Sequence, residues 1–133
     1  MTGNGVPKDA EQAAKWMHLA AEHGDPEAEC NLAVLYQTGT GVPQSFSDAI
    51  VWYQKSAEQG NLKAQHNLGA LYGNGQGTKQ DFVTAYKWLL LSLRGGYSDS
   101  QQGLDWLKTQ ATVKQVEEAE QQANEWAQAH SRH

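Results

Sequence analysis

Residues 28–60 read AECNLAVLYQTGTGVPQSFSDAIVWYQKSAEQG, and residues 64–96 read AQHNLGALYGNGQGTKQDFVTAYKWLLLSLRGG. The second stretch repeats the first 36 residues later, and the same register extends through most of the chain. The positions that recur at this spacing are Gly5, Gly41 and Gly77; Ala13, Ala49 and Ala85; Trp16, Trp52 and Trp88; Gly24, Gly60 and Gly96; Leu32, Leu68 and Leu104; and Leu35, Leu71 and Leu107. Self-similarity at such a period is the signature of a repeat protein in which each unit is one supersecondary element.

Each repeating unit is predicted to contain two helices joined by a glycine-containing turn. In the first helix Ala28, Leu32, Leu35 and Tyr36 recur at the helical spacing and share one face. The turn TGTGVP at 38–43 supplies glycines that tolerate positive φ, followed by a proline that blocks further helix. Apolar helices alternating with such turns predict antiparallel helix pairs.

Capping residues mark the ends of the helices at equivalent positions. Second helices are expected to start after an aspartate or a serine, both N-cap types, and to stop at a glycine in a left-handed C-cap. The starts are Asp9, Ser45 and Asp81, and the stops are Gly24, Gly60 and Gly96. Asp25-Pro26 and Asn61 then open the next first helices, with the proline at a position that suits it.

Helix pairs of this kind cannot bury their apolar faces alone, but a stack of pairs can. Small residues at Ala13, Ala49 and Ala85 would let the helix axes approach closely, and the tryptophan positions would fill the space between pairs. The sequence therefore predicts an all-α, right-handed superhelix (solenoid) of 36-residue helix-turn-helix repeats with a C-terminal capping helix. This single repeat domain, 1–133, would comprise a partial unit at 2–24, repeats at 25–60 and 61–96, and a final helix pair with its cap at 97–129.

The chain departs from the repeat after Leu107. Residues 112–115 (TVKQ) match the capping-box pattern, in which a threonine and a glutamine three residues on satisfy each other's backbone N–H groups. The helix that follows is apolar at Val116, Ala119, Ala123, Trp126 and Ala127. Its other face is polar, as expected of a last helix that closes the open end of a solenoid.

The N-terminus carries no comparable cap. Residues 2–7 (TGNGVP) align with the turn at 38–43, which is the tail of a unit whose first helix is not in this chain. We hypothesise that the chain is an N-terminally truncated fragment or that its true start lies upstream; the chain shows no signal peptide of its own, and its compartment is unknown. The helix expected over 10–22 would lack a neighbour, so apolar surface near Trp16 and Met17 would be partly bare and open to homodimerisation.

Composition narrows the classes of function. The formal charge is −5, from 10 basic and 15 acidic residues, and the sequence has no basic cluster of the kind that nucleic-acid binding requires. No apolar run approaches the ~20 residues of a membrane-spanning helix, so no membrane insertion is expected. A single cysteine, Cys30, excludes an intrachain disulfide and leaves the compartment undetermined.

The repeat resembles the Sel1-like repeat family, a relative of the tetratricopeptide repeat. The unit that matches best carries the family's pattern at Ala64, Asn67-Leu68-Gly69, Leu71-Tyr72, Gly75, Gly77, Asp81, Ala85, Trp88 and Gly96. The resemblance covers about residues 2–108 and implies an adaptor that binds a partner protein or peptide. Some bacterial members carry a disulfide in every repeat, and the enzymatic roles suggested for them gain no support from a chain with one cysteine.

In such superhelices the first helices line the concave surface. One stripe of residues on these helices changes from unit to unit while the core positions repeat, which favours a partner on that face. The predicted contact residues are Glu27, Cys30, Asn31, Val34, Gln37, Lys63, His66, Asn67, Ala70, Asp99, Gln102 and Trp106. Three alternatives stay open: the stripe is only solvated, Trp106 packs beneath the closing helix, and Asn31 and Asn67 bond to backbone in a neighbouring turn.

No constellation of residues predicts catalysis, metal binding or a cofactor, and the protein is predicted not to be an enzyme. His18 and His23 are five residues apart and point to different sides of a helix. Cys30 and His66 occupy equivalent positions, but a nucleophile pair would also need an orienting group and an oxyanion site. The glycines at 73–77 lack the strand and the Lys-Ser/Thr of a phosphate loop. The competing interpretations are a structural fragment of a longer repeat protein and a small-molecule-binding or enzymatic module.

Overall fold

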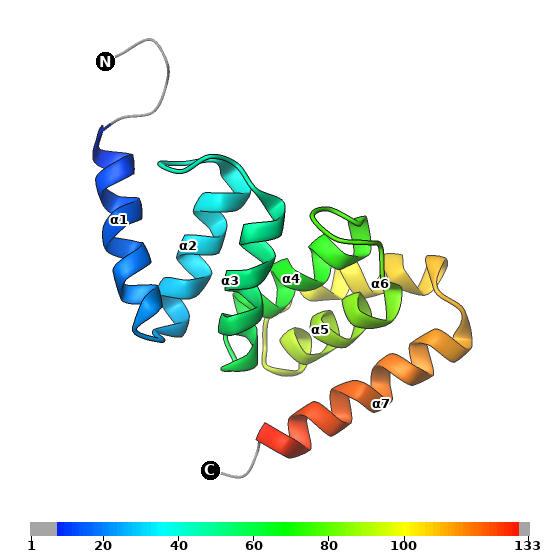
Figure 1. The fold of residues 1–133 in the computed structure, drawn as a ribbon. Helices are drawn as coiled ribbons and strands as arrows, with labels where there is room; N and C mark the ends of the chain where they lie inside the picture. The colour runs from blue at the N-terminus through cyan, green and yellow to red at the C-terminus, as the bar shows by residue number, and fades with distance from the viewer. Residues whose placement is uncertain (1–7, 131–133) are drawn as a thin grey trace.

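The structure, a computed structural model, describes residues 8–130 and contains seven helices and no strand within that range. The helices are α1 (Lys8–Glu22), α2 (Pro26–Thr38), α3 (Phe46–Glu58), α4 (Leu62–Asn74), α5 (Phe82–Arg94), α6 (Ser100–Gln110) and α7 (Val113–His130). Figure 1 shows α1, α2 and α3 side by side, and the direction of the helices turns as the stack continues through α4 to α6. The all-α solenoid predicted from the repeat is confirmed; residues 2–7 of the expected partial unit lie outside the described residues.

Most helix ends coincide with the predicted capping residues. The Ser45 side chain accepts a hydrogen bond from the Asp48 N–H at 3.2 Å, and Asp25, Asn61 and Asp81 cap α2, α4 and α5 in the same way. The stops at Gly24, Gly60 and Gly96 adopt φ values of 86°, 92° and 109°, as a left-handed helix stop requires. The same local signals therefore set the same helix lengths in successive units.

The first helix departs from the expected pattern. Because α1 begins at Lys8, Asp9 lies in its first turn and is not the N-cap residue. Ala13 was expected to be buried like its equivalents in later units, but it is exposed and Ala14 is buried instead. The expected bare surface is present at Trp16, which is 66 % exposed, and extends to Leu19, which is 49 % exposed. Met17, which was expected to be bare as well, is only partly exposed and packs against the cluster formed by Ala21, Ala28 and Leu32.

In each of two successive units, one buried serine joins the second helix to the first. Ser56 of α3 donates a hydrogen bond to the Pro26 carbonyl at 2.6 Å, and Ser92 of α5 donates one to the Leu62 carbonyl at 2.8 Å. Both the donors and the acceptors are 36 residues apart. Since a buried hydroxyl without a partner costs about 1–3 kcal/mol, this bond fixes the end of each second helix against the start of its own first helix.

Glu29 of α2 is a buried carboxylic acid between α2 and α3. The Gln59 side-chain amide donates a hydrogen bond to its Oε1 at 2.6 Å. Burial raises the pKa of Glu29 above its usual value, and the nearby Lys55 ammonium and the bond from Gln59 only partly oppose this. The fold therefore favours the protonated form of this side chain.

Replacing Glu29 with glutamine should raise the thermal stability at pH 7 and leave it unchanged near pH 4. The folded-state pKa of Glu29 lies above the unfolded value of 4.5, so its favourable contribution is complete below that pH and is lost as the pH rises through the folded pKa. A neutral amide at this position keeps an acceptor for Gln59 and removes the cost of burying a charge. Melting curves from pH 4 to 8 measure the difference in melting temperature between Glu29→Gln and the parent. Glu27→Gln, at an exposed position two residues away, is the control and should show no such gap.

The last helix closes the stack as predicted. The capping box is formed: the Thr112 N–H donates to Gln115 Oε1 at 2.8 Å, and the Gln115 N–H donates to Thr112 Oγ1 at 3.1 Å. Helix α7 then packs along α5, where Ala119 and Ala123 are fully buried. In Figure 1 it runs below α5 and back toward the end of α3. The predicted capping helix is confirmed, and it covers second helices of the repeat units.

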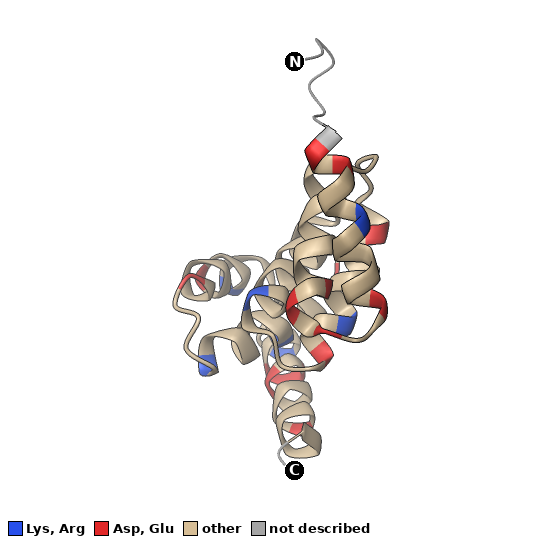
Figure 2. Cartoon of the chain, turned by 90° about the vertical axis from the view of Figure 1, so that its left-hand side faces the viewer, with Lys and Arg blue, Asp and Glu red and all other residues tan. Residues whose placement is uncertain are grey.

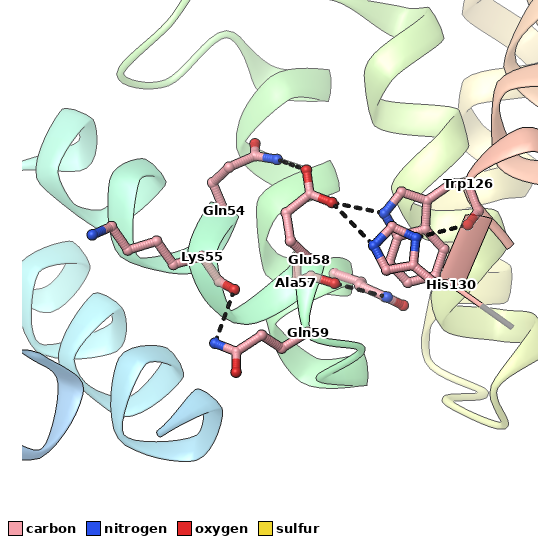
Figure 3. A network of polar contacts seen from close by, with 8 residues as sticks. Gln54, Lys55, Ala57, Glu58, Gln59, Trp126 and His130 are labelled. Carbon is pink, nitrogen blue, oxygen red and sulfur yellow. Dashed lines mark hydrogen bonds and ion pairs between the residues drawn. The ribbon is translucent and has the colours of Figure 1, made fainter. Parts of the chain in front are cut away.

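The end of α7 is joined to α3 around Glu58 (Figure 3). Trp126 Nε1 donates a hydrogen bond to Glu58 Oε1 at 2.8 Å, and His130 Nε2 lies 3.8 Å from the same oxygen. The other carboxylate oxygen accepts a hydrogen bond from Gln54 at 2.8 Å. The His130 ring stacks on Trp126 with ring centroids 3.8 Å apart. Helix α7 therefore contacts two successive repeat units.

Candidate functional site

A cavity of about 570 Å³ lies between α4 and α6, on the side of the stack formed by first helices. Leu89 of α5 and Leu107 of α6 provide its apolar floor. Gly69 and Gly73 of α4 and Gly103 of α6 lie beside these two buried leucines. The lining residues are His66, Gly69, Ala70, Gly73, Asn74, Leu89, Asp99, Gln102, Gly103, Trp106 and Leu107. We call this cavity the α4–α6 groove.

The equivalent junction between α2 and α4 is closed by a partly buried polar network. The Tyr53 hydroxyl donates a hydrogen bond to Gln37 Oε1 at 2.6 Å and accepts one from Asn67 Nδ2 at 3.2 Å. Tyr53 is completely buried, and its ring and both amide side chains occupy the space between the helices. The cavity that remains at this junction, between the starts of α2 and α4, is smaller, at about 330 Å³.

The α4–α6 junction differs from the α2–α4 junction at three equivalent positions of the repeat. At the positions 36 residues after Tyr53, Gln37 and Asn67, the chain has Leu89, Gly73 and Gly103. A phenol becomes an aliphatic chain, and two amide side chains are lost. All three replacements line the α4–α6 groove. The groove thus follows from sequence changes at one junction of an otherwise regular repeat.

The glycines of the groove differ in the space around them. A Cβ atom on Gly69 or Gly103 would come within 2.9 or 2.8 Å of the Leu89 side chain, so these glycines let α4 and α6 approach α5. A Cβ atom on Gly73 would meet nothing closer than 3.5 Å, which is ordinary van der Waals contact. Position 73 therefore accepts the Cβ atom of an alanine without a steric clash.

One end of the groove is polar. His66 Nδ1 lies 2.8 Å from Ser100 Oγ, and the imidazole ring packs against Tyr97. Burial lowers the pKa of His66, with the Asp99 carboxylate opposing the shift, so His66 is neutral at pH 7. Asp99 precedes α6 but makes no side-chain bond to the helix backbone, unlike the residues that cap α2 to α5. Among the lining residues, Asp99 is the only acidic one, and none is a lysine or an arginine.

The other end of the groove is aromatic. Trp106 is 44 % exposed, and its ring meets Phe82 edge-on with centroids 6.2 Å apart. The alternative that Trp106 packs beneath the closing helix is therefore wrong, since it lies against α5 and lines the groove. The exposed amides of Asn74 and Gln102 also line the groove and can offer both donors and acceptors.

The structure places the predicted contact residues in three settings. Five line the α4–α6 groove: His66, Ala70, Asp99, Gln102 and Trp106. Four line a smaller cavity of about 330 Å³ between the starts of α2 and α4: Glu27, Cys30, Asn31 and Lys63. Three pack at the closed α2–α4 junction: Val34, Gln37 and Asn67. The predicted stripe is thus divided between two cavities and a packed junction.

Two expectations for these residues are wrong. Cys30 was placed opposite the core face, but it is 2 % exposed because its side chain falls in the cluster that α3 and α4 form with α2. Burial raises the pKa of its thiol to about 11, so it is not a thiolate nucleophile at neutral pH. Asn67 bonds to the Tyr53 hydroxyl and not to backbone in a neighbouring turn.

Sequence reasoning missed the floor of the groove and the residues that open it. Leu89 and Leu107 were assigned to the core, and Gly69, Gly73 and Gly103 were not recognised as part of a site. A signal was present, because two amide side chains of one junction become glycine in the next. This change could be interpreted only with the knowledge that Gln37 and Asn67 both bond to the Tyr53 hydroxyl.

Residues 8–130 contain neither a metal-binding cluster nor a membrane-spanning helix. No group of three His, Cys, Asp or Glu side chains in this range is arranged to hold a metal ion. None of the helices described here combines the length and apolar character needed to cross a bilayer.

The stacked helix pairs, with a cavity between two first helices, define an α-helical repeat protein. The sequence model of the Sel1 repeat matches residues 1–25, 26–61 and 62–97. The chain therefore belongs to the Sel1 repeat family.

Two solved structures are similar to this chain. One is c5321, a protective antigen present in uropathogenic Escherichia coli strains that displays an SLR fold; the TM-score is 0.88 at 28 % identity, over 94 % of this chain and 27 % of that one. The other is a Sel1 repeat protein from Oxalobacter formigenes, with a TM-score of 0.70 at 35 % identity over 77 % of this chain and 42 % of that one. The chain spans less than half the length of either structure. No curated protein matches it.

Proposed function

We propose that this chain is a protein-interaction module that binds a segment of a partner protein in the α4–α6 groove. Sel1 repeat proteins generally serve as scaffolds for protein interactions. The observation that carries the proposal is the replacement of a partly buried polar network by a leucine and two glycines, at the junction of the stack that holds the groove. The proposed contacts are the five predicted residues that line this groove: His66, Ala70, Asp99, Gln102 and Trp106.

Filling the groove at Gly73 should weaken partner binding by about tenfold or more without unfolding the protein, because the lost contact area is worth more than about 1.4 kcal/mol. Gly73 lines the groove, and a Cβ atom there would make only ordinary contacts, the nearest with Ala85 at 3.5 Å. The smaller change Gly73→Ala should raise the free energy of unfolding by about 0.5–1 kcal/mol, since alanine costs less entropy than glycine in a helix.

The experiment uses the parent chain as bait to capture a partner, which is then purified for calorimetric titration. The variants are Gly73→Leu and Gln101→Leu, the second placing the same side chain on the exposed face of α6 away from the groove. The parent and Gln101→Leu should bind alike, and Gly73→Leu should bind weakly. Equal affinities for all three proteins would place the partner elsewhere and contradict the proposal.

The bare face of α1 favours a second interaction, between two copies of the chain. Trp16 and Leu19 are exposed there, next to a cavity of about 580 Å³ between α1 and the turn at 41–42. A twofold contact would cover the same patch on both copies.

Trp16→Glu should abolish self-association through this face, because it would place a charge where the contact excludes water. Sedimentation equilibrium over a hundredfold range of concentration measures the monomer–dimer equilibrium. Val113→Glu, at an exposed valine at the start of α7, is the control and should behave like the parent. A parent chain that stays strictly monomeric at high concentration would rule out this homodimer.

A further inference from the structure

A stripe of three residues on α1 has its equivalents on α3 and α5 at the repeat spacing. The stripe is Ala13, Trp16 and Ala20, and its equivalents are Ala49, Trp52 and Ser56 on α3 and Ala85, Trp88 and Ser92 on α5. On α3 and α5 the alanine and the serine are fully buried, whereas on α1 Ala13 is exposed and Trp16 is 66 % exposed. Helix α1 therefore leaves bare the surface by which the other second helices pack.

The first helix of the same unit covers this stripe on α3 and on α5. Ser56 and Ser92 donate hydrogen bonds to carbonyl groups at the starts of α2 and α4. Ala85 lies directly against α4, since a Cβ atom on Gly69 would come within 3.0 Å of the Ala85 carbonyl oxygen. The described residues include no first helix for α1. Continuity of the repeat therefore assigns this side of α1 to a first helix.

Two positions distinguish the first helices along which a second helix packs. They are a small residue, Ala33 or Gly69, and a tyrosine three residues later, Tyr36 or Tyr72. The small residues are buried, and the tyrosines pack half-buried against the core. In α6 these positions are Asp105 and Lys108, both exposed, and α7 packs along α5 and not along α6. A small residue and a tyrosine thus define the helix that fits the stripe.

The bare side of α1 is suited to an apolar helix. Lys15 is the only lysine, arginine, aspartate or glutamate among residues 12–21. Figure 2 views the molecule from the side on which α1 lies, and most of the front of this helix is drawn as uncharged. An apolar helix face without a cover is typical of an interaction site.

We infer that this side of α1 binds the first helix of a Sel1-type repeat unit that lies outside these 133 residues. The bound helix presents a small residue and, three positions later, a tyrosine, and it packs on Ala13, Trp16 and Ala20 as α2 packs on α3. This interaction does not involve the α4–α6 groove. It competes with the homodimer proposed above, because both occupants would cover Trp16.

The test extends the full chain with a copy of residues 25–37, joined to Thr2 in place of Met1. This junction keeps the 36-residue register, because residues 2–7 align with residues 38–43. The extended chain should melt at least about 5 °C above the parent, since the added helix removes Ala13 and the Trp16 ring from water. Amide exchange in α1 should slow by at least about tenfold, and sedimentation equilibrium should show a monomer.

The matched control carries Ala33→Asp and Tyr36→Lys in the added copy only, which is the pair that α6 has at these positions. Because a charge would then face the apolar stripe, this chain should melt within about 1 °C of the parent. An extended chain that melts no higher than the parent, or no higher than this control, would overturn the inference. A dimer that persists in the extended chain as strongly as in the parent would show that a second copy, and not a first helix, occupies this side of α1.

Discussion

Trp88→Ala is expected to lower the free energy of unfolding by about 3–5 kcal/mol, the range for removing a fully buried tryptophan. Trp88 is 1 % exposed, and its ring meets Trp126 of α7 edge-on with centroids 5.7 Å apart. Its loss would leave a cavity where α5 and the closing helix meet. Since a domain of this size has a total stability of about 5–15 kcal/mol, the melting temperature should fall by roughly 10–20 °C. Urea denaturation followed by circular dichroism measures the change.

Trp16→Ala is the matched control, because Trp16 occupies the same position of the repeat. Its side chain is 66 % exposed, so its removal should change the free energy of unfolding by less than about 1 kcal/mol at concentrations where the chain is monomeric. Equal losses for Trp16→Ala and Trp88→Ala would mean that the face of α1 is covered in solution. Such a result would contradict the exposed surface described for α1.

Gly77→Ala is expected to destabilise the protein by about 2–5 kcal/mol, through two separate costs. Gly77 has φ of 78°, a left-handed conformation that costs an alanine about 1–2 kcal/mol. In addition, a Cβ atom there would lie 2.7 Å from the Phe46 backbone carbon at the start of α3, and such overpacking costs about 1–3 kcal/mol. Chemical denaturation of the purified variant measures the sum of the two costs.

Gly60→Ala separates these two costs. Gly60 also has a positive φ, 92°, but a Cβ atom there would meet nothing within 4 Å. Only the conformational cost of about 1–2 kcal/mol is expected. If the two variants lost the same stability, the turn at 75–81 would not be packed on α3, contrary to the structure.

The regular part of the fold was predictable because its signals are local. Ser45, Asp81 and Asn61 begin helices through bonds to backbone N–H groups two or three residues away, and Gly60 and Gly96 end them through their own φ. These interactions depend on adjacent residues, so a sequence pattern specifies them fully. Their recurrence every 36 residues then predicted a stack.

Features that depend on three helices at once were not predictable in the same way. Cys30 was misplaced because its burial depends on how α3 and α4 pack around α2. The groove was missed because it combines Leu89 of α5, Gly73 of α4 and Gly103 of α6. No local pattern distinguishes a glycine that shortens the distance between helices from one that leaves a cavity.

Helix α7 changes how the stack is expected to come apart. In a solenoid whose units touch only their neighbours, stability is close to a sum of local terms, and each end frays independently. Because α7 packs on α5 and also reaches Glu58 of α3, it adds a coupling between units that skips one neighbour. The C-terminal part of the molecule should therefore open as one cooperative body, whereas α1 can open alone. Amide exchange would then show two levels of protection, with the boundary near the turn at 23–25. Unfolding of this repeat array would therefore begin at its N-terminal helix.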